Sequence, residues 1–329
     1  MSGLQRSSPR LKARASPYHS GVTLFAIPDA SGSATPPRPT KRVKIESALD
    51  EPSISGEGSQ SPSKSPSKRP LKSPQKSKTL YKKALATPHP TPPHWREVYD
   101  CIKEMRSQTV APVDAMGCHM AQRYEKDPKN KRFVTLVSLM LSPQTKDQVT
   151  DAAVGKLRTA LGGSVSLDAV LAADPTVISE AINKVGMWRV KTKHLKLAAE
   201  KLRDDFDSDV PQTIEGLISL PGVGPKIGFL ALQNAWNINV GIGVDVHVLR
   251  ITRLLGWHKA ENPEDARISL ESWLPAELQS EINPLLVGFG QTICPANSPR
   301  CGECKLGASG LCPSAKMPTK KKPQAVPDW

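Results

Sequence analysis

The apolar residues from Trp95 onward recur with the period of an α-helix, and this pattern constrains the fold more than any other feature. Phe133, Leu136, Val137, Met140 and Leu141 fall at i, i+3, i+4, i+7 and i+8, which gives one apolar stripe along a helix. Similar stretches cover residues 148–160, 166–172, 175–184, 190–206, 213–219, 225–236, 244–255, 263–272 and 278–290. Gly and Pro separate these stretches, and alternating runs typical of strands are scarce. The sequence therefore predicts an all-α fold in one or two helical lobes.

The first 93 residues have a different composition. They hold 16 Lys and Arg against 5 Asp and Glu, a net charge of +11, and 15 of the 31 prolines. With few large apolar residues, such a segment cannot offset the entropy lost on ordering. We expect residues 1–93 to be a disordered basic tail, residues 94–316 to be the folded domain and residues 317–329 to be a short basic C-terminal tail. Because the chain as a whole carries +14, only +3 remains outside the first segment, so bulk charge does not argue for a nucleic-acid-binding fold.

Short motifs in the tail predict targeting and modification. The basic run Lys41-Arg42-Val43-Lys44 resembles a signal for a nuclear import receptor. Ser-Pro-x-Lys sequences begin at Ser61, Ser65 and Ser73 and resemble sites of a proline-directed kinase. The basic first thirty residues also suit a mitochondrial presequence, so we expect the nucleus and, as a second location, the mitochondrion. No apolar run is long enough for a membrane span, and we expect a monomer.

The segment Leu220-Pro-Gly-Val-Gly-Pro-Lys226 lies between two helical stretches. Gly222 and Gly224 permit a tight hairpin with positive φ and a close approach of backbone N–H groups to an anion. Pro225 suits the first turn of the next helix, whose N-terminus also favours phosphate. The pattern predicts a helix-hairpin-helix that holds a DNA backbone. Lys226 could then meet a phosphate, or act as a nucleophile if partial desolvation favours its neutral amine; the residues alone leave both roles open.

Two polar residues follow at the start of the next helical stretch, in Gly243-Val-Asp-Val-His247. Asp245 suits a helix N-cap, and this role is compatible with catalysis. His247 suits a structural position or one beside a DNA phosphate better than the role of a base.

Four of the six cysteines, Cys294, Cys301, Cys304 and Cys312, crowd into a loop rich in Pro and Gly. An intracellular disulfide framework is not expected, whereas four thiolates within such a short segment can close around one metal centre. Both zinc and a four-iron cluster accept four cysteines, so spacing alone does not choose between them.

The motifs LPGVGPK, VDVHV and C-x6-C-x2-C…C, in this order, resemble the endonuclease III family, and most closely its eukaryotic homologues. The resemblance covers about residues 95–316. It implies a helix-hairpin-helix DNA glycosylase fold, with two lobes, DNA between them and one 4Fe-4S cluster in the C-terminal loop. In two places the chain departs from the family's pattern. The gap before Cys312 is longer than usual, and Val246 stands where a threonine is usual.

The resemblance also implies roles for single residues. By this resemblance, Lys226 would be the Schiff-base nucleophile and Asp245 would be its carboxylate partner. Gln144, in Leu141-Ser-Pro-Gln-Thr-Lys-Asp147, would be the side chain that enters the gap left by an extruded nucleotide. Lys191 lies in a second DNA-facing loop, Val185-Gly-Met-Trp-Arg-Val-Lys191, where it would meet phosphate. The cluster ligands become Cys294, Cys301, Cys304 and Cys312.

The resemblance implies a base-excision repair enzyme that removes oxidised pyrimidines from duplex DNA and cleaves abasic sites by β-elimination. One alternative is a monofunctional adenine or mismatch glycosylase of the same superfamily, but those enzymes lack a lysine at the hairpin position. A second is a non-enzymatic DNA-binding module, which would leave the placement of Asp245 unexplained.

Overall fold

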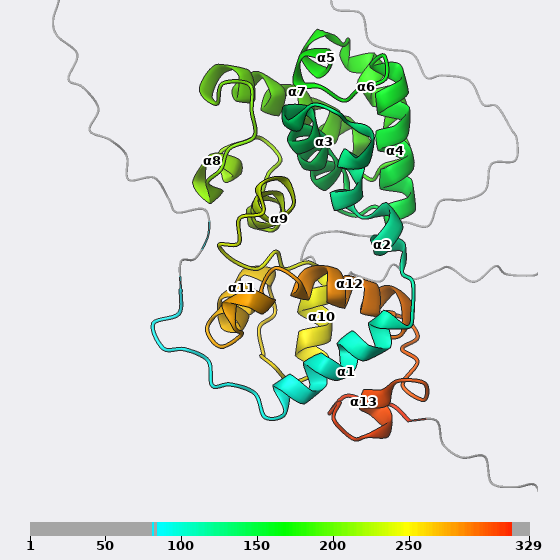
Figure 1. The fold of residues 1–329 in the computed structure, drawn as a ribbon, viewed down its shortest axis with the longest axis vertical. Helices are drawn as coiled ribbons and strands as arrows, with labels where there is room; N and C mark the ends of the chain where they lie inside the picture. Colours follow the sequence, from blue (N-terminus) through cyan, green and yellow to red (C-terminus); the bar gives the residue numbers. More distant parts are fainter. Residues whose placement is uncertain (1–80, 82–83, 318–329) are drawn as a thin grey trace, which may run out of the picture. The chain divides into compact units, whose positions relative to one another are not determined.

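The computed structural model describes residue 81 and residues 84–317, and in this part of the chain all regular structure is helical (Figure 1). The predicted all-α fold class is confirmed. The helices are α1 (Trp95–Ser107), α2 (Pro112–Met116), η1 (Cys118–Tyr124), α3 (Pro128–Leu141), α4 (Asp147–Ala160), α5 (Leu167–Ala172), α6 (Pro175–Ala181), α7 (Trp188–Asp205), α8 (Ile214–Ile218), α9 (Pro225–Trp236), α10 (Val246–Leu254), α11 (Pro263–Glu271), η2 (Ala276–Leu278), α12 (Ile282–Thr292) and α13 (Lys305–Ala308). None of these helices is long and apolar enough to cross a membrane.

Two hydrophobic cores divide the helices into two lobes (Figure 1). The first lobe is formed by the middle of the sequence, η1 and α3 to α9, and the second by α1 and α10 to α13. The second lobe is thus built from the segments that precede and follow the first lobe in the sequence. Short polar side chains fix several helix starts by accepting a backbone N–H, namely Asp127, Ser166, Asp174, Thr213 and Asn262.

Helix α3 is the central element of the first lobe. Every residue from Phe133 to Leu141 is buried, and the helix packs against α9, η1, α4 and α7. Helix α9 is equally apolar, with Ile227 to Leu232 buried. Because two apolar helices pack with little freedom to slide, the C-terminal end of α3 and the N-terminal end of α9 are held in fixed relation.

One side chain joins the two lobes through hydrogen bonds. The Gln291 amide on α12 donates to the carboxylate of Asp147 at the start of α4 (2.7 Å) and accepts from the backbone N–H of Val113 in α2 (3.0 Å). These bonds tie the second lobe to the first beside the end of the loop that precedes α4.

The predicted tail boundary at residue 93 falls too late. Tyr81 donates from its hydroxyl to Glu215 (2.6 Å), and its ring packs edge-on against Phe229 at 5.9 Å between centroids. Further along, the His89 N–H donates to the Ser272 hydroxyl (2.9 Å), and Pro92 is buried. Composition averaged over a window conceals such isolated anchors. The predicted import signal, kinase sites and presequence, and all but residue 317 of the predicted C-terminal tail, lie outside the described residues.

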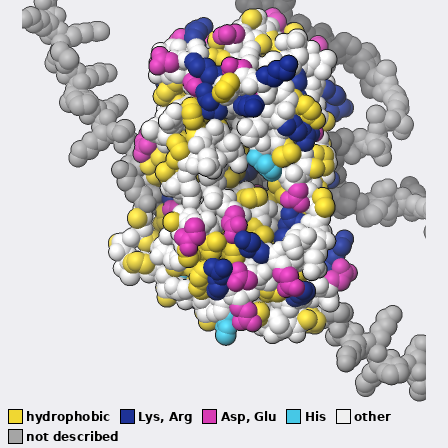
Figure 2. All heavy atoms as spheres, in the orientation of Figure 1, with side chains coloured by type: hydrophobic (Ala, Val, Ile, Leu, Met, Phe, Trp, Pro, Cys, Tyr) yellow, Lys and Arg dark blue, Asp and Glu magenta, His cyan; other side chains and the backbone are white. Residues whose placement is uncertain are grey.

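Charges are mixed over the visible surface of the described domain (Figure 2). Lys and Arg are interspersed with Asp and Glu on both lobes, and no single-sign patch dominates this face. This distribution agrees with the small net charge of the chain beyond the N-terminal segment.

We predict that Tyr81→Ala lowers the thermal unfolding midpoint, because the ring contact with Phe229 and the hydrogen bond to Glu215 are both lost. The loss of a half-buried aromatic corresponds to about 1–2 kcal/mol, or roughly 2–8 °C in a domain of this size. Differential scanning calorimetry measures the shift. Tyr81→Phe keeps the ring and should lose less, and a chain that starts at Lys78 should melt with the full chain. An unchanged midpoint in Tyr81→Ala would show that the contacts of Tyr81 do not stabilise the lobes.

Candidate active site

The hairpin predicted at residues 220–226 lies between α8 and α9. The Val223 N–H donates to the Leu220 carbonyl (3.1 Å) and closes the turn. Gly222 has φ +82°, and a Cβ there would lie 2.8–3.0 Å from the His194 ring, so the turn requires glycine. Gly224 precedes α9, and no atom lies within 4 Å of where its Cβ would be. The backbone at Gly224 therefore faces open space at a helix N-terminus, as an approaching phosphate requires.

Lys226 is the second residue of α9 and is partly buried. Its charge acts on groups from other elements. Burial raises the pKa of the Cys118 thiol, and Lys226 opposes that rise. Burial lowers the pKa of Lys191 to about 8, and the charge of Lys226 adds to the decrease. The hairpin lysine thus sits at a junction of η1, α7 and α9.

Asp245 is the N-cap of α10, as predicted. One carboxylate oxygen, Oδ1, accepts from the backbone N–H groups of His247 (2.9 Å) and Val248 (2.8 Å). The loop before it is fixed by the buried Asn283 amide, which donates to the Gly243 carbonyl (2.7 Å). Within the described residues Oδ2 has no hydrogen-bond partner, so the second oxygen is left for another group.

His247 shows that Asp245 and Lys226 share one electrostatic neighbourhood. Burial lowers the pKa of His247, Asp245 opposes the decrease and Lys226 adds to it. The ring lies against Gly290 of α12, where a Cβ would come within 2.4 Å of Nδ1. That buried nitrogen has no hydrogen-bond partner in the described structure. A neutral, packed ring corresponds to the structural role, one of the two that the sequence left open.

Gln144 lies in the loop between α3 and α4 and is exposed. Its φ is +57°, a left-handed conformation that is uncommon for a residue with a side chain. The second predicted DNA-facing loop packs directly on it. The Gly186 N–H donates to the Thr145 hydroxyl (3.1 Å), and a Cβ at Gly186 would lie 2.7 Å from the Gln144 carbonyl oxygen. The structure thus brings both loops together.

Lys191 differs from its predicted role at a DNA phosphate. The side chain is buried, and its ammonium donates to the carbonyls of Leu141 (2.7 Å) and Pro143 (2.6 Å). The reason is local: α3 ends at Leu141, which leaves carbonyls unpaired beside α7, and an ammonium satisfies them. The Lys191 ammonium therefore stabilises the loop that carries Gln144. A contact with a DNA phosphate does not fit the buried position of this side chain.

The four clustered cysteines lie in the segment that follows α12. All four are free thiols and half-buried, and three of them, with Leu306, pack on the core of the second lobe. Burial raises the pKa of both Cys304 and Cys312, and the neighbouring thiols Cys294 and Cys301 raise it further. The Arg250 guanidinium lies 3.6 Å from the Cys294 sulfur. In the described residues the side chains do not converge into a formed group of three or more metal ligands.

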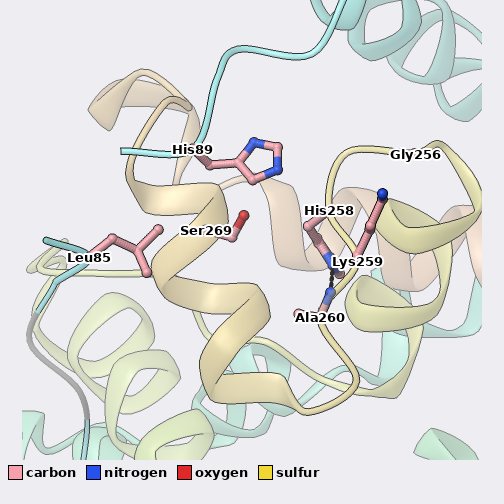
Figure 3. A pocket seen from close by; sticks show the side chains of 7 residues that line it. All are labelled: Leu85, His89, Gly256, His258, Lys259, Ala260 and Ser269. Atoms are coloured by element: carbon pink, nitrogen blue, oxygen red, sulfur yellow. Dashed lines mark hydrogen bonds between the residues drawn. The ribbon is translucent and has the colours of Figure 1, made fainter. Parts of the chain in front are cut away.

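A pocket of about 570 Å³ lies elsewhere, between the segment that holds Leu85 and His89 and the second lobe (Figure 3). Leu85 and His89 line one side of it, and His258 with Lys259 and Ala260 lines the other. Both ring nitrogens of His258 are engaged, Nε2 with Thr252 (2.7 Å) and Nδ1 with the Ala260 N–H (3.1 Å). Burial lowers the pKa of His258 to about 4. This histidine is a neutral structural group, and the predicted catalytic residues Lys226 and Asp245 do not line the pocket.

Sequence patterns did not reveal the contacts of three residues that position the site. Asp147 lies in the segment 141–147 that contains Gln144, but no sequence pattern indicates its hydrogen bond with Gln291. Asn283 gives no signal at all, because a buried amide in an apolar helix has no motif. For Lys191 the resemblance implied a contact with a DNA phosphate, and its bonds to the Leu141 and Pro143 carbonyls were missed. A lysine within an otherwise apolar helical stripe would have been the available signal.

Comparisons with known proteins match this arrangement. A family model described as "HhH-GPD superfamily base excision DNA repair protein" matches residues 137–276. The chain is 50% identical over 227 residues to the endonuclease III homolog of Schizosaccharomyces pombe, a match that covers 68% of this chain and 63% of that protein. It is 45% identical to the endonuclease III-like protein 1 of Gallus gallus over 68% of this chain and 79% of that protein. The matched region thus spans less than two thirds of the yeast relative.

Solved structures share the fold. A non-covalent endonuclease III–DNA complex matches with a TM-score of 0.57 at 23% identity, over 67% of this chain and 94% of that chain. A trapped endonuclease III–DNA covalent intermediate matches with a TM-score of 0.56 at 24% identity, over 67% of this chain and 96% of that chain. At this level of identity the likeness concerns the arrangement of helices.

We predict that the cap and the charge of Asp245 can be separated. Asp245→Ala removes the acceptor for two N–H groups and should destabilise the protein by about 1–2 kcal/mol, or roughly 2–8 °C. Asp245→Asn keeps a capping oxygen and should stay within about 0.5 kcal/mol of the wild type. Thermal unfolding followed by circular dichroism measures both. Equal losses in the two variants would mean that the carboxylate charge, rather than the cap, stabilises α10.

Proposed function

Because this chain belongs to the endonuclease III family, we propose that it is a bifunctional DNA N-glycosylase and abasic-site lyase that removes oxidised pyrimidines from duplex DNA. One observation carries the proposal. A lysine in the first turn of a hairpin helix, Lys226, shares its electrostatic neighbourhood with the carboxylate of Asp245. A nucleophilic amine and a nearby carboxylate are what a Schiff-base mechanism needs.

The reaction starts with extrusion of the damaged nucleotide, because a base inside the duplex is out of reach and a weakly stacked base costs less to extrude. The neutral amine of Lys226 attacks C1′ of the sugar, and the bond from C1′ to the base breaks with its electron pair leaving on the base. The Oδ2 atom of Asp245 faces the developing positive charge on the sugar, while the two N–H donors hold Oδ1 in place. Loss of a proton to solvent and opening of the sugar ring yield an imine between C1′ and the lysine nitrogen.

The imine makes the C2′ proton acidic, since the resulting carbanion is conjugated with the iminium nitrogen. Removal of this proton and departure of the 3′ phosphate oxygen complete β-elimination, and water then hydrolyses the imine to free the lysine. Asp245 is suited to assist the proton transfers. His247 is not assigned a proton-transfer step, because its ring is packed and its buried Nδ1 has no partner in the described structure.

DNA binding is proposed to use the hairpin and the Gln144 loop. The backbone at Gly222 and Gly224, together with the N-terminal end of α9, would accept a phosphate without reading sequence. Gln144 would enter the gap left by the extruded nucleotide, where its amide can pair with the orphaned base. Duplex DNA with an oxidised pyrimidine or an abasic site is the proposed partner.

We also propose that Cys294, Cys301, Cys304 and Cys312 hold one 4Fe-4S cluster. Four free thiols in one electrostatic neighbourhood on the second lobe support it, and so does the cationic side chain of Arg250 beside Cys294. A negatively charged cysteine-ligated cluster is stabilised by such a cation. When bound, the cluster would supply folding energy to the loop. No step of base removal requires it.

For the cell, we propose nuclear import through Lys41–Lys44, with the mitochondrion as a second location and with kinase sites at the Ser-Pro-x-Lys sequences. These motifs rest on the sequence. A monomer is proposed as the active form.

Borohydride trapping tests the reaction. We predict that Lys226→Gln abolishes the covalent adduct and strand cleavage on a thymine glycol duplex, while binding of that duplex weakens by less than about tenfold, because only one of several backbone contacts is changed. Lys156→Gln on the exposed face of α4 is the matched control and should keep both activities. An adduct formed by Lys226→Gln would reject the nucleophile. If the wild type releases the base without forming an adduct, the result would favour the monofunctional glycosylase. If it only binds the duplex, the result would favour the DNA-binding module.

We predict that anaerobically purified protein contains about four iron atoms and negligible zinc, with the broad visible absorbance of thiolate-to-iron charge transfer. Cys301→Ser should lose iron and absorbance, and it should loosen the segment around α13 in hydrogen exchange, because the ligands tie that segment together. Cys101→Ser, at a half-buried position on α1, is the matched control. If the wild type instead contains about one zinc atom per chain, the four cysteines form a structural zinc site and do not hold an iron–sulfur cluster.

A further inference from the structure

The buried ammonium of Lys191 joins two points of the chain on either side of Ser142. The side chain is 8% exposed, and it donates to the last carbonyl of α3, at Leu141, and to the carbonyl of Pro143. The second carbonyl belongs to the residue directly before Gln144. A buried cation is costly unless it is paired, so these two bonds are strong local constraints.

Gln144 needs such constraints. A side-chain-bearing residue at φ +57° carries backbone strain. Strain of this kind persists only where the surroundings determine the conformation. Lys191 holds the loop from the α7 side, and Gly186 closes on the Gln144 carbonyl from the second loop, where a Cβ would lie at 2.7 Å. The exposed side chain of Gln144 is thus presented from a fixed backbone.

We propose that Lys191 is a positioning residue that holds Gln144 ready to occupy the gap left by the extruded nucleotide. The inference rests on the proposed glycosylase function. It assigns Lys191 to extrusion rather than to phosphate binding, because two of the three ammonium donors already serve carbonyls inside the protein. Without the ammonium, the end of α3 and the start of the loop lose their common donor, and Gln144 can leave its left-handed conformation.

Extrusion and chemistry can be measured separately. A thymine glycol paired with adenine must be unstacked before its base is released, whereas a preformed abasic site has no base to unstack. We expect Lys191→Met to slow single-turnover base release from the thymine glycol duplex by at least about tenfold, since misplacement of a positioned group costs up to about a hundredfold. Borohydride trapping at a preformed abasic site should stay within about threefold of the wild type.

The chain offers a matched control on the same helix. The Lys196 ammonium donates to the carbonyls of Val170 (3.1 Å), Leu171 (2.7 Å) and Ala173 (2.9 Å) at the end of α5. Lys196→Met therefore removes the same kind of interaction from a loop that does not carry Gln144. It should leave the ratio of base release to trapping unchanged. Lys191→Gln keeps N–H donors without the charge and gives a second variant in case Lys191→Met does not fold; its loss should be smaller and of the same kind.

A double-mutant cycle with Gln144→Ala completes the test. If Lys191 acts through Gln144, adding Lys191→Met to Gln144→Ala slows base release by less than about twofold further, because coupled residues are not additive. Additive losses, equal losses in base release and trapping, or no loss in either Lys191 variant would overturn the proposal. A wild-type protein that neither releases the base nor forms the adduct would instead reject the proposed function.

Discussion

The packing of α3 against α9 is the constraint on which the rest of the site depends. Both helices are apolar around most of their circumference, so neither can rotate without exposing core residues. The C-terminal end of α3 delivers the Gln144 loop, and the N-terminal end of α9 delivers Lys226 and the hairpin. The side chain proposed to enter DNA and the amine proposed to react with it are therefore placed by one rigid helix pair, although each stands on a loop or a helix end.

The candidate site residues stand at helix ends rather than on helix faces. At the start of α10 the Asp245 carboxylate satisfies two backbone N–H groups with one oxygen and keeps the other unpaired within the described residues. At the end of α3 the unpaired carbonyls are met by Lys191. Each unsatisfied terminus is a place where a charged side chain is stabilised without an ion pair. This explains how a domain of small net charge can hold several charged groups close together.

The sequence predicts elements and motifs well because they depend on local patterns. Helical periodicity identified the fold class, and the glycine spacing identified the hairpin whose turn requires Gly222. The sequence predicts the role of Lys191 and the position of the tail boundary less well, because both depend on tertiary contacts. The partner of the Lys191 ammonium is a carbonyl fifty residues away, and the partner of Tyr81 is Glu215. A charged side chain in a basic sequence gives no sign of whether it will face water or the end of another helix.

Charge distribution bears on how such a domain would hold DNA. Basic and acidic side chains are interspersed on the visible face (Figure 2). The residues after the N-terminal segment carry a small net charge, so a long-range positive field from the folded part is weak. The N-terminal 77 residues carry 13 Lys and Arg against 5 Asp and Glu, a net charge of +8, which is more than the +6 of all the residues that follow. Under the proposed function, attraction to DNA and its salt dependence would arise largely from the charge of this segment, whereas the folded domain would supply short-range contacts from backbone N–H groups at the hairpin. The rate of encounter with DNA and the short-range contacts with it would then depend on different parts of the chain. A change of charge in the N-terminal segment would alter the rate of encounter without altering the geometry around Lys226.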